Sequence, residues 1–190
     1  QGRAYGVELL AKWQVPDRIN ASASLTLYQS EYRNDKHSPY LPSAWDNRYI
    51  LNMICIWSLP REWDLGAKIS VIGGAPYTPY DEEKSSFVEA WNASGRPLYN
   101  YDLYNTCRLA SYAQLDLRID KNYFFRKWRL GWYISLQNVT GSKLKEQDPF
   151  ISTGEILNQN DPLKEQRYRM RTIKQETRSI IPSLGITVEF

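Results

Sequence analysis

The chain has 190 residues and a net charge of +3 at pH 7, and 14% of its residues are aromatic. Two cysteines and one histidine exclude a disulfide-stapled mini-protein and a histidine-rich metal site, and the small net charge argues against nucleic-acid binding. The longest wholly apolar run, Met53–Trp57, is far shorter than the roughly 20 residues of a transmembrane helix. Transmembrane strands need no such run, because they alternate lipid-facing and lumen-facing residues. The composition therefore excludes a membrane-spanning helix and leaves membrane-spanning strands open.

The start of the chain indicates a piece of something longer. It opens on Gln1-Gly2-Arg3 and lacks the basic start, apolar stretch and cleavage site of a signal peptide. A patterned segment follows almost at once. We therefore expect a mature or excised part of a larger protein.

Alternation of apolar and polar residues predicts seven strands. Strict period two over eight to ten residues is typical of strands with one apolar face, and no comparable stretch shows a helical period of 3.6. One segment, residues 49–57, is apolar on both parities apart from Asn52. The sequence predicts an all-β chain, with strands over residues 5–13, 21–28, 49–57, 63–71, 113–120, 128–136 and 184–190.

The connections between these strands alternate in length. Short ones cover residues 15–18, 59–62 and 122–127, and long ones cover residues 33–46, 75–111 and 141–179. Tight turns at one end and long loops at the other are typical of an outer-membrane barrel, with the turns in the periplasm and the loops outside. The predicted fold is an antiparallel up-and-down transmembrane β-barrel.

Four of the seven tryptophans fall at the short-turn end of this arrangement. They are Trp13, Trp57, Trp63 and Trp128, and Phe190 falls at the same level. An indole combines an apolar body with a hydrogen-bonding edge and suits a membrane interface, so we interpret the four as a membrane girdle. Tryptophan near a strand end is also common in any β protein.

Four segments, in order along the chain, resemble the barrel of TonB-dependent outer-membrane receptors, particularly those of the Bacteroidetes. They are residues 73–81 (GGAPYTPYD), residues 112–121 (YAQLDLRIDK), Asn138-Val139 and the closing stretch 182–190 (PSLGITVEF). The resemblance implies a barrel of about 22 strands with a plug domain. Residues 1–190 would form its C-terminal segment, with about the last seven strands and three long extracellular loops. The plug and the earlier strands are absent from this chain.

The resemblance also implies a function and partners. The complete receptor would reside in the outer membrane and take up a scarce or bulky nutrient with energy supplied by the TonB complex, which contacts the absent N-terminal region. Other expected partners are the rest of the receptor, outer-membrane lipid, lipopolysaccharide and a surface lipoprotein. Phe190 ends a strand that resembles the signal read by the barrel-assembly machinery. The transported ligand stays open between a siderophore, a corrinoid, a glycan and a peptide.

The competing hypothesis is a soluble, aromatic-rich, carbohydrate-binding β-sandwich. Such a domain buries one face of each sheet in a core and has no reason to gather four tryptophans in one belt. An enzyme is disfavoured, since His37 is the one histidine, and Ser-His-Asp or Cys-His catalysis would rest on this single loop residue. We predict no catalytic residue, no metal site and no cofactor. The run Asp81-Glu82-Glu83 is better explained as part of a polar loop than as a cation site.

Candidate ligand contacts lie in the second long loop. Exposed aromatic rings can stack on sugars or planar ligands, although the same rings could pack the loop against itself. The candidates are Tyr77, Tyr80, Trp91, Tyr99, Tyr101 and Tyr104. In the third loop, Arg167, Arg169 and Arg171 alternate with other residues and indicate a strand with one cationic face, suited to lipopolysaccharide phosphates or to solvent.

The strand pattern also predicts which residues face lipid and how the cysteines behave. Leu65, Ile69, Leu117, Ile134 and Ile186 should face lipid, and Lys68, Asp116 and Arg118 should face the lumen. Cys55 lies near the turn end and Cys107 in a long loop, too far apart for the roughly 7 Å that a disulfide allows. We expect Cys55 to be packed against lipid or in a core, and Cys107 to be exposed and more easily alkylated.

Overall fold

The computed structural model describes residues 1–143, 145–174 and 179–190 and has an all-β, antiparallel fold. Its main sheet contains every one of the seven predicted strands, each paired with its neighbour in the chain, in the order β1-β2-β4-β5-β8-β9-β12. The strands are β1 (Gly2–Val15), β2 (Ile19–Tyr32), β4 (Tyr49–Leu59), β5 (Trp63–Ile72), β8 (Tyr112–Phe124), β9 (Arg129–Gln137) and β12 (Ile181–Glu189). The two-residue β3 (Leu41–Pro42) pairs with the end of β2.

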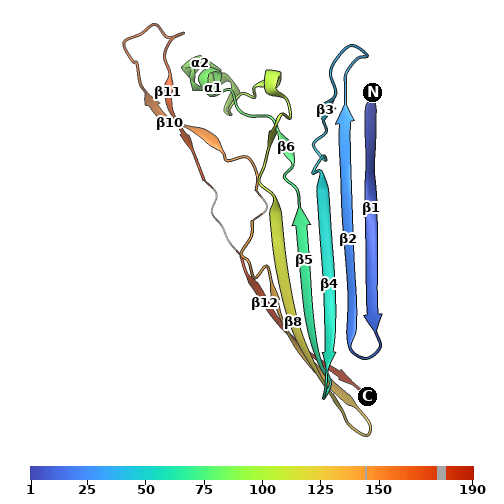
Figure 1. Ribbon diagram of the computed structural model, residues 1–190. Coiled ribbons are helices and arrows are strands. Elements are labelled where there is room, and N and C mark those ends of the chain that lie inside the picture. The colour runs from blue at the N-terminus through green and yellow to red at the C-terminus, as the bar shows by residue number, and fades with distance from the viewer. Residues whose placement is uncertain (144, 175–178) are drawn as a thin grey trace.

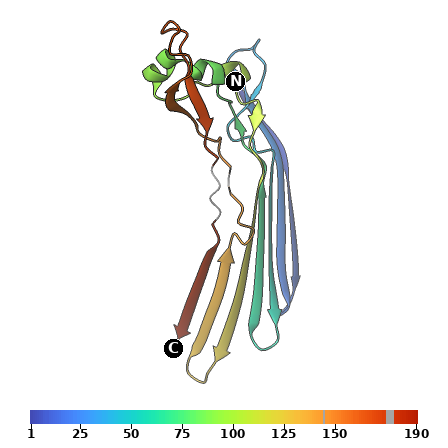
Figure 2. The ribbon, with the colours of Figure 1, turned by 90° about the vertical axis from the view of Figure 1, so that its left-hand side faces the viewer.

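The sheet is one curved layer with open edges. Figures 1 and 2 show the tight turns at one end of the strands and the long loops at the other. In the described part of the chain, β1 and β12 each pair on one side only, so the sheet does not close on itself. An antiparallel meander is therefore established, and closure into a barrel stays a prediction.

The turns use backbone conformations that favour tight reversal. Asp17, Arg61 and Glu62 have positive φ values of 54°, 65° and 61°, as hairpin turns that match the strand twist require. The third turn differs from the predicted 122–127. Because β8 keeps pairing as far as Phe124↔Arg129, the reversal lies at residues 125–128 instead.

The strand register places the alternating apolar residues of the seven strands on one face. Strand β4, which is apolar on both parities, also carries Ile50, Ile54 and Ile56 on the opposite face. Residues directly opposite each other in antiparallel strands point to the same side of the sheet. One row across the sheet runs Trp13↔Ala21↔Cys55↔Ala67↔Leu117↔Leu136. The predicted parity is confirmed: Leu65, Ile69, Leu117, Ile134 and Ile186 share this apolar face, and Lys68, Asp116 and Arg118 lie on the opposite, polar face.

Nothing in the described part of the chain covers the apolar face. The only buried hydrophobic side chains among those residues are Val88 and Phe150, and both belong to the long loops. On β1, the side chains of Leu9 and Trp13 are 60% and 61% exposed. The seven-stranded sheet therefore has no hydrophobic core of its own. No helix in the described residues is long and apolar enough to cross a membrane.

The three long loops gather at one end into what we call the loop cap: loop 1 (residues 33–48), loop 2 (residues 73–111) and the described part of loop 3 (residues 138–180). Loop 2 contains two helices that the sequence pattern did not predict, because each is too short to display a helical period. Asp81 caps the first by accepting a 2.9 Å hydrogen bond from the Lys84 amide. The cap elements are β6 (Pro76–Tyr77), α1 (Glu82–Ser86), α2 (Val88–Ser94), η1 (Tyr101–Leu103), β7 (Cys107–Arg108), β10 (Phe150–Ile156) and β11 (Tyr168–Thr172).

Candidate functional site

A buried carboxylate joins loop 1 to loop 2. Asp46 is fully buried; its Oδ1 accepts a 2.9 Å hydrogen bond from the Ser30 amide, and its Oδ2 pairs with Arg48 at 3.1 Å and with Arg108. Arg108 also donates to the Gly74 carbonyl at 3.1 Å. Burial acts to raise the pKa of Asp46, but the Ser30 amide and the two guanidiniums outweigh it and hold the pKa below its ordinary value. Asp46 is therefore a charged anchor at the base of the cap.

A second joint lies beside the first. The side-chain amide of Asn105 donates to the Pro42 carbonyl in loop 1 at 2.8 Å, while its backbone amide donates to the Thr78 hydroxyl at 3.1 Å. Asn105 has a positive φ of 52°, a conformation that asparagine adopts more readily than most residues. Loops 1 and 2 are thus held together through buried polar groups.

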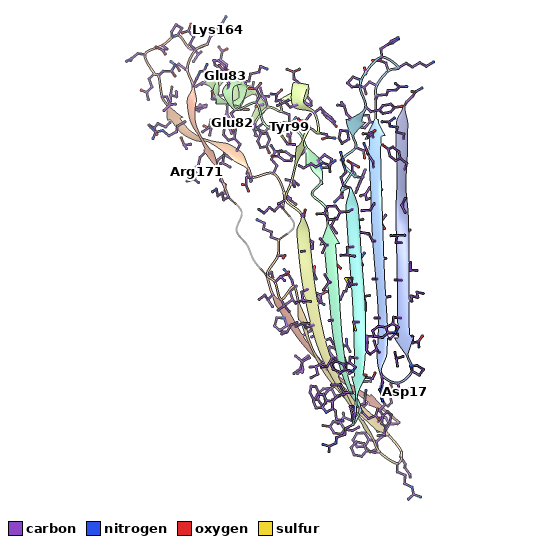
Figure 3. The ribbon with its side chains drawn as sticks, in the orientation of Figure 1. Asp17, Glu82, Glu83, Tyr99, Lys164 and Arg171 are labelled. Carbon is purple, nitrogen blue, oxygen red and sulfur yellow. The ribbon has the colours of Figure 1, made fainter. Side chains whose placement is uncertain are left out.

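Loop 2 is joined to loop 3 through the hairpin of β10 and β11. The Val88 amide donates to the Gln166 carbonyl at 3.0 Å, and Arg167 pairs with Glu83 at 3.1 Å while lying 4.5 Å from the Phe87 ring centroid. Figure 3 shows Glu82 and Glu83 beside this hairpin, which carries Lys164 and Arg171, whereas Asp17 lies at the far, turn end. The three loops therefore form one connected body.

The hairpin confirms the predicted cationic strand but neutralises most of its charge. β11 spans the stretch in which the arginines alternate, and it pairs with β10. Arg167 pairs with Glu83, and Arg169 pairs with Glu155 at 3.0 Å. Arg171 is exposed. The same basic stretch of sequence continues to Arg178, which lies outside the described residues.

Six aromatic rings form a continuous file through the cap. Successive ring centroids lie 6.3, 5.1, 6.2, 6.3 and 6.3 Å apart, within the range of favourable aromatic pairs. The file links loop 3 to the end of β2 in the order Phe150, Tyr80, Tyr99, Tyr101, Tyr104 and Tyr32. We call this set the aromatic file.

The structure brings four of the six predicted loop aromatics together and separates two. Tyr80, Tyr99, Tyr101 and Tyr104 are in the file. Tyr77 packs instead beside Cys107. Its pKa is raised, mainly because the ring is partly buried and secondly because the Cys107 thiol lies beside it. Trp91 lies on α2, away from the file.

Sequence reasoning missed two members of the file, Tyr32 and Phe150. Tyr32 was overlooked because it ends a strand rather than lying in the loop. Phe150 carried a usable signal, since it is a large apolar residue that immediately follows Asp148-Pro149 in a polar loop.

A cavity opens at each end of the aromatic file. The first-loop cavity, of about 450 Å³, is lined by Tyr32, Arg33, Asn34, Ser38, Pro39, Leu41, Tyr101 and Tyr104. The third-loop cavity, of about 560 Å³, lies beside Tyr77, Tyr80 and Phe150 and is lined by charges of both signs. Both volumes fall in the range of small-molecule sites.

At the opposite end of the sheet, aromatic rings gather near the tight turns. Trp13 and Trp57 lie on the apolar face and are 61% and 51% exposed, and Trp63 lies on the same face. Trp128 lies in the third turn and stacks on Phe125 at 4.1 Å. Trp132, which we had not assigned to the girdle, meets Trp63 edge to face at 5.5 Å. Phe190 follows β12 at this end and is fully exposed.

The two cysteines are unpaired, as expected, but their surroundings correct one prediction. Cys107 is half-buried against Tyr77 rather than exposed, because β7 pairs with β6 at this point. Cys55 is exposed on the apolar face. The described residues contain no cluster of three metal-ligating side chains, and the backbone of the lone His37 simply donates to Asp35.

Comparisons with models of protein families, with curated proteins and with solved structures found no match for this chain. What the protein does must therefore be inferred from its sheet and its loop cap. Both features are defined by residues that the structure describes.

Proposed function

We propose that this chain supplies the C-terminal strands and loops of a TonB-dependent outer-membrane receptor that takes up a scarce or bulky nutrient. The sheet spans the outer membrane with its apolar face toward lipid, and the loop cap lies outside the cell. One observation carries the proposal: seven strands in register present a single-layered, uncovered apolar face.

The dimensions of the apolar face support a membrane environment. Tyr5 and Tyr49 bound it at the loop end, and Trp13 and Trp57 bound it at the turn end, eight residues further along each strand. Eight residues at ~3.3 Å rise and ~40° tilt span roughly 20 Å, close to the apolar band of about 25 Å in outer-membrane barrels. Aromatic residues at both limits are expected at the two interfaces.

The energetics of the face point the same way. Leaving a large apolar side chain in water rather than burying it costs about 1.5–3 kcal/mol each. Val7, Leu9 and Leu25 on neighbouring strands all share this face. Lipid chains would cover these side chains without any second protein layer.

Lys121 fits a membrane interface as well, although it lies on the apolar face. Its ammonium lies 5.5 Å from the Trp63 ring and 4.7 Å from the Tyr123 ring, and it donates to the Arg61 carbonyl in the turn. The side chain thus carries its charge away from the centre of the face, as lysines near a membrane surface do.

The same observation disfavours the soluble carbohydrate-binding sandwich. A sandwich packs two sheets face to face about 10 Å apart. No second sheet lies across either face of the seven strands in the described part of the chain. The free edges at β1 and β12 further support additional strands that complete a barrel.

The TonB-dependent assignment itself is supported by the four ordered motif resemblances. Gly73 and Gly74 of the first motif lie where loops 1 and 2 meet. A Cβ at Gly73 would collide with the Asn47 carbonyl, and one at Gly74 would collide with the Leu109 carbonyl. The motif therefore has a structural reason for two glycines at the base of the loop cap.

Location and membrane contact provide the first test. The complete protein, expressed in a Gram-negative host, should sediment with the outer membrane and require detergent for extraction. When the protein is reconstituted into vesicles of lipids brominated on their acyl chains, its tryptophan fluorescence should be quenched relative to vesicles of the same lipids without bromine. A protein that stays soluble without detergent would contradict the proposal and favour the sandwich.

Energised uptake provides the second test. Growth on the transported nutrient should require the complete receptor and should stop when TonB is deleted from the host. Uptake that persists without TonB would remove the TonB-dependent assignment and leave the outer-membrane location intact.

A further inference from the structure

The first-loop cavity is lined by few of the groups that join the loops of the cap to one another. The Asp46 and Asn105 joints lie outside its lining, and so do Tyr80, Tyr99 and Phe150 of the aromatic file. Its walls combine three tyrosines, Tyr32, Tyr101 and Tyr104, with the polar side chains of Asn34 and Ser38. Its chemistry can therefore be examined separately from the packing of the cap.

One ring of the cavity wall is widely accessible, and a half-buried ring packs beside it. Tyr101 is 71% exposed, the most exposed ring of the aromatic file. Tyr104 lies nearly parallel to it, at an interplanar angle of 14° and a centroid distance of 6.3 Å, and Tyr32 meets Tyr104 edge-on. Flat aromatic faces of this kind bind the C–H faces of ring-shaped ligands while their hydroxyls stay wet.

The charge of the cavity disfavours an anionic ligand. In the described part of the chain, Arg33 is the one cation that lines it, and no carboxylate does. Arg33 already donates from Nε to the Gln1 side chain at 3.0 Å and from Nη1 to the Lys36 carbonyl at 3.0 Å. Its guanidinium also stacks 4.6 Å from the Tyr40 ring centroid. Few of its donors remain for phosphate or for a ferric trianion, which binds best to several free cations.

The polar groups that remain available are neutral. The Asn34 side-chain amide makes no hydrogen bond to any residue that the structure describes, so it can donate two hydrogen bonds and accept two. The backbone around it is ordered by Asp35, which accepts hydrogen bonds from the Ser38 amide at 2.9 Å and the Ser38 hydroxyl at 2.6 Å. An amide of this kind matches a pair of neighbouring hydroxyls.

We propose that the first-loop cavity binds the ring of a neutral saccharide, stacked on the exposed Tyr101 ring with its hydroxyl edge toward Asn34. This inference rests on the proposed function, because it makes an oligosaccharide the nutrient that the receptor captures. Within the aromatic file, Tyr101 contacts the ligand, Tyr104 supports it from the cavity wall, and Tyr80, Tyr99 and Phe150 connect the loops.

The test is calorimetric binding to the complete receptor in an amine-oxide detergent, which carries no sugar that could compete. The probes are neutral hexasaccharides of the malto-, cello- and xylo- series and, as the anionic arm, a ferric tris-catecholate. At least one neutral hexasaccharide should bind, and Tyr101→Ala should weaken that binding by about tenfold or more, as expected for a central aromatic contact.

Two further variants distinguish the loss of stacking between Tyr101 and the saccharide from a general disturbance of the loops. Trp45→Ala removes another exposed loop ring, 81% exposed and outside the cavity, and should change the affinity less than about twofold. Asn34→Ala should weaken the saccharide about fivefold or more, since it removes hydrogen bonds to the hydroxyl edge. Equal effects of Tyr101→Ala and Trp45→Ala would overturn the site.

The remaining outcomes distinguish this inference from the proposed function. Binding of the ferric complex alone, or of none of the probes, would overturn the saccharide assignment while an outer-membrane receptor could still stand. Saccharide binding that depends on Tyr101, in a protein that is not found in the outer membrane, would overturn the proposed function and leave the cavity assignment in place.

Discussion

The sheet and the loop cap are stabilised in different ways. Eight of the nine side chains that are buried in the described residues lie in the loops: Asp46, Pro76, Thr78, Ser85, Ser86, Val88, Asn105 and Phe150. The sheet contributes only Lys121, at its turn end. The cap therefore holds itself together by polar anchors and stacked rings, whereas the sheet relies on backbone pairing and on whatever surrounds it. A regular sheet without a core indicates an environment that provides the missing apolar layer.

The largest test of this difference is a charge on the apolar face. Leu117→Arg lies opposite Ala67 and Leu136 near the middle of the sheet, and it should cost about 2–4 kcal/mol of folding free energy in lipid vesicles. Ser24→Arg, on the polar face opposite Asn52, should cost less than about 1 kcal/mol. Denaturant titrations of the complete protein in vesicles measure both values. Equal costs would break the assignment of the two faces.

A smaller effect, confined to the cap, is expected from its anchor. Asp46→Ala leaves Arg108 and the Ser30 amide without their shared acceptor and should lower the local stability of the cap by about 1.5–3 kcal/mol. Hydrogen exchange followed by mass spectrometry should show faster exchange in loops 1 and 2 and unchanged exchange in β4 and β5. Faster exchange throughout the sheet would mean that the two regions are not independent.

The pH dependence of the cap follows from the same carboxylate. The folded-state pKa of Asp46 is below its ordinary 3.8, so its contribution is complete above that value and is lost as the pH falls through the folded-state pKa. Acid should therefore lower the local stability of the cap in the unmodified protein. The difference in exchange rates between this protein and Asp46→Ala should become smaller. Exchange rates compared at pH 6 and pH 3, after correction for intrinsic chemistry, measure the change. A difference in exchange rates between the two proteins that is larger at pH 3 than at pH 6 would contradict the lowered pKa of Asp46.

The smallest expected effect concerns the end of α2. Gly95 has a φ of 62°, and no atom lies within 4 Å of the place that a Cβ would occupy, so Gly95→Ala introduces only backbone strain. The cost should be about 1 kcal/mol, confined to loop 2. Local exchange in residues 88–95 reports it, and Gly95→Asn should recover part of the loss because asparagine tolerates this conformation better.

The regular part of the fold was predictable from neighbouring residues alone. Alternation such as Trp63, Leu65, Ala67, Ile69 and Val71 depends only on local spacing, and it located the seven long strands of the main sheet and both of its faces, but not the two-residue β3. The error in the third turn arose because Asn122 and Tyr123 look like turn residues, although pairing with Gly131 and Leu130 keeps them in the strand.

The loop cap was much less predictable because its contacts join distant segments. Asp46 and Arg108 are 62 residues apart, and no local pattern marks them as partners. Tyr32 joins the aromatic file from the end of β2 and Phe150 joins it from loop 3, and the cavity beside Tyr101 exists only when loops 1 and 2 meet. The sequence identified most of the rings, and the tertiary arrangement determined which of them are accessible.

The open edges at β1 and β12 bear on the order of events during biogenesis. Each edge strand presents backbone N–H and C=O groups that have no hydrogen-bond partner in the described chain. Hydrocarbon offers no partner either, and each unpaired group placed in it costs several kcal/mol. A flat sheet of these seven strands would therefore meet a steep barrier on entering a bilayer. If the protein functions as proposed, these strands enter the membrane only once both edges have been matched by neighbouring strands or by an assembly factor that lends its own edge. Insertion and closure then become one concerted step, rather than two successive ones.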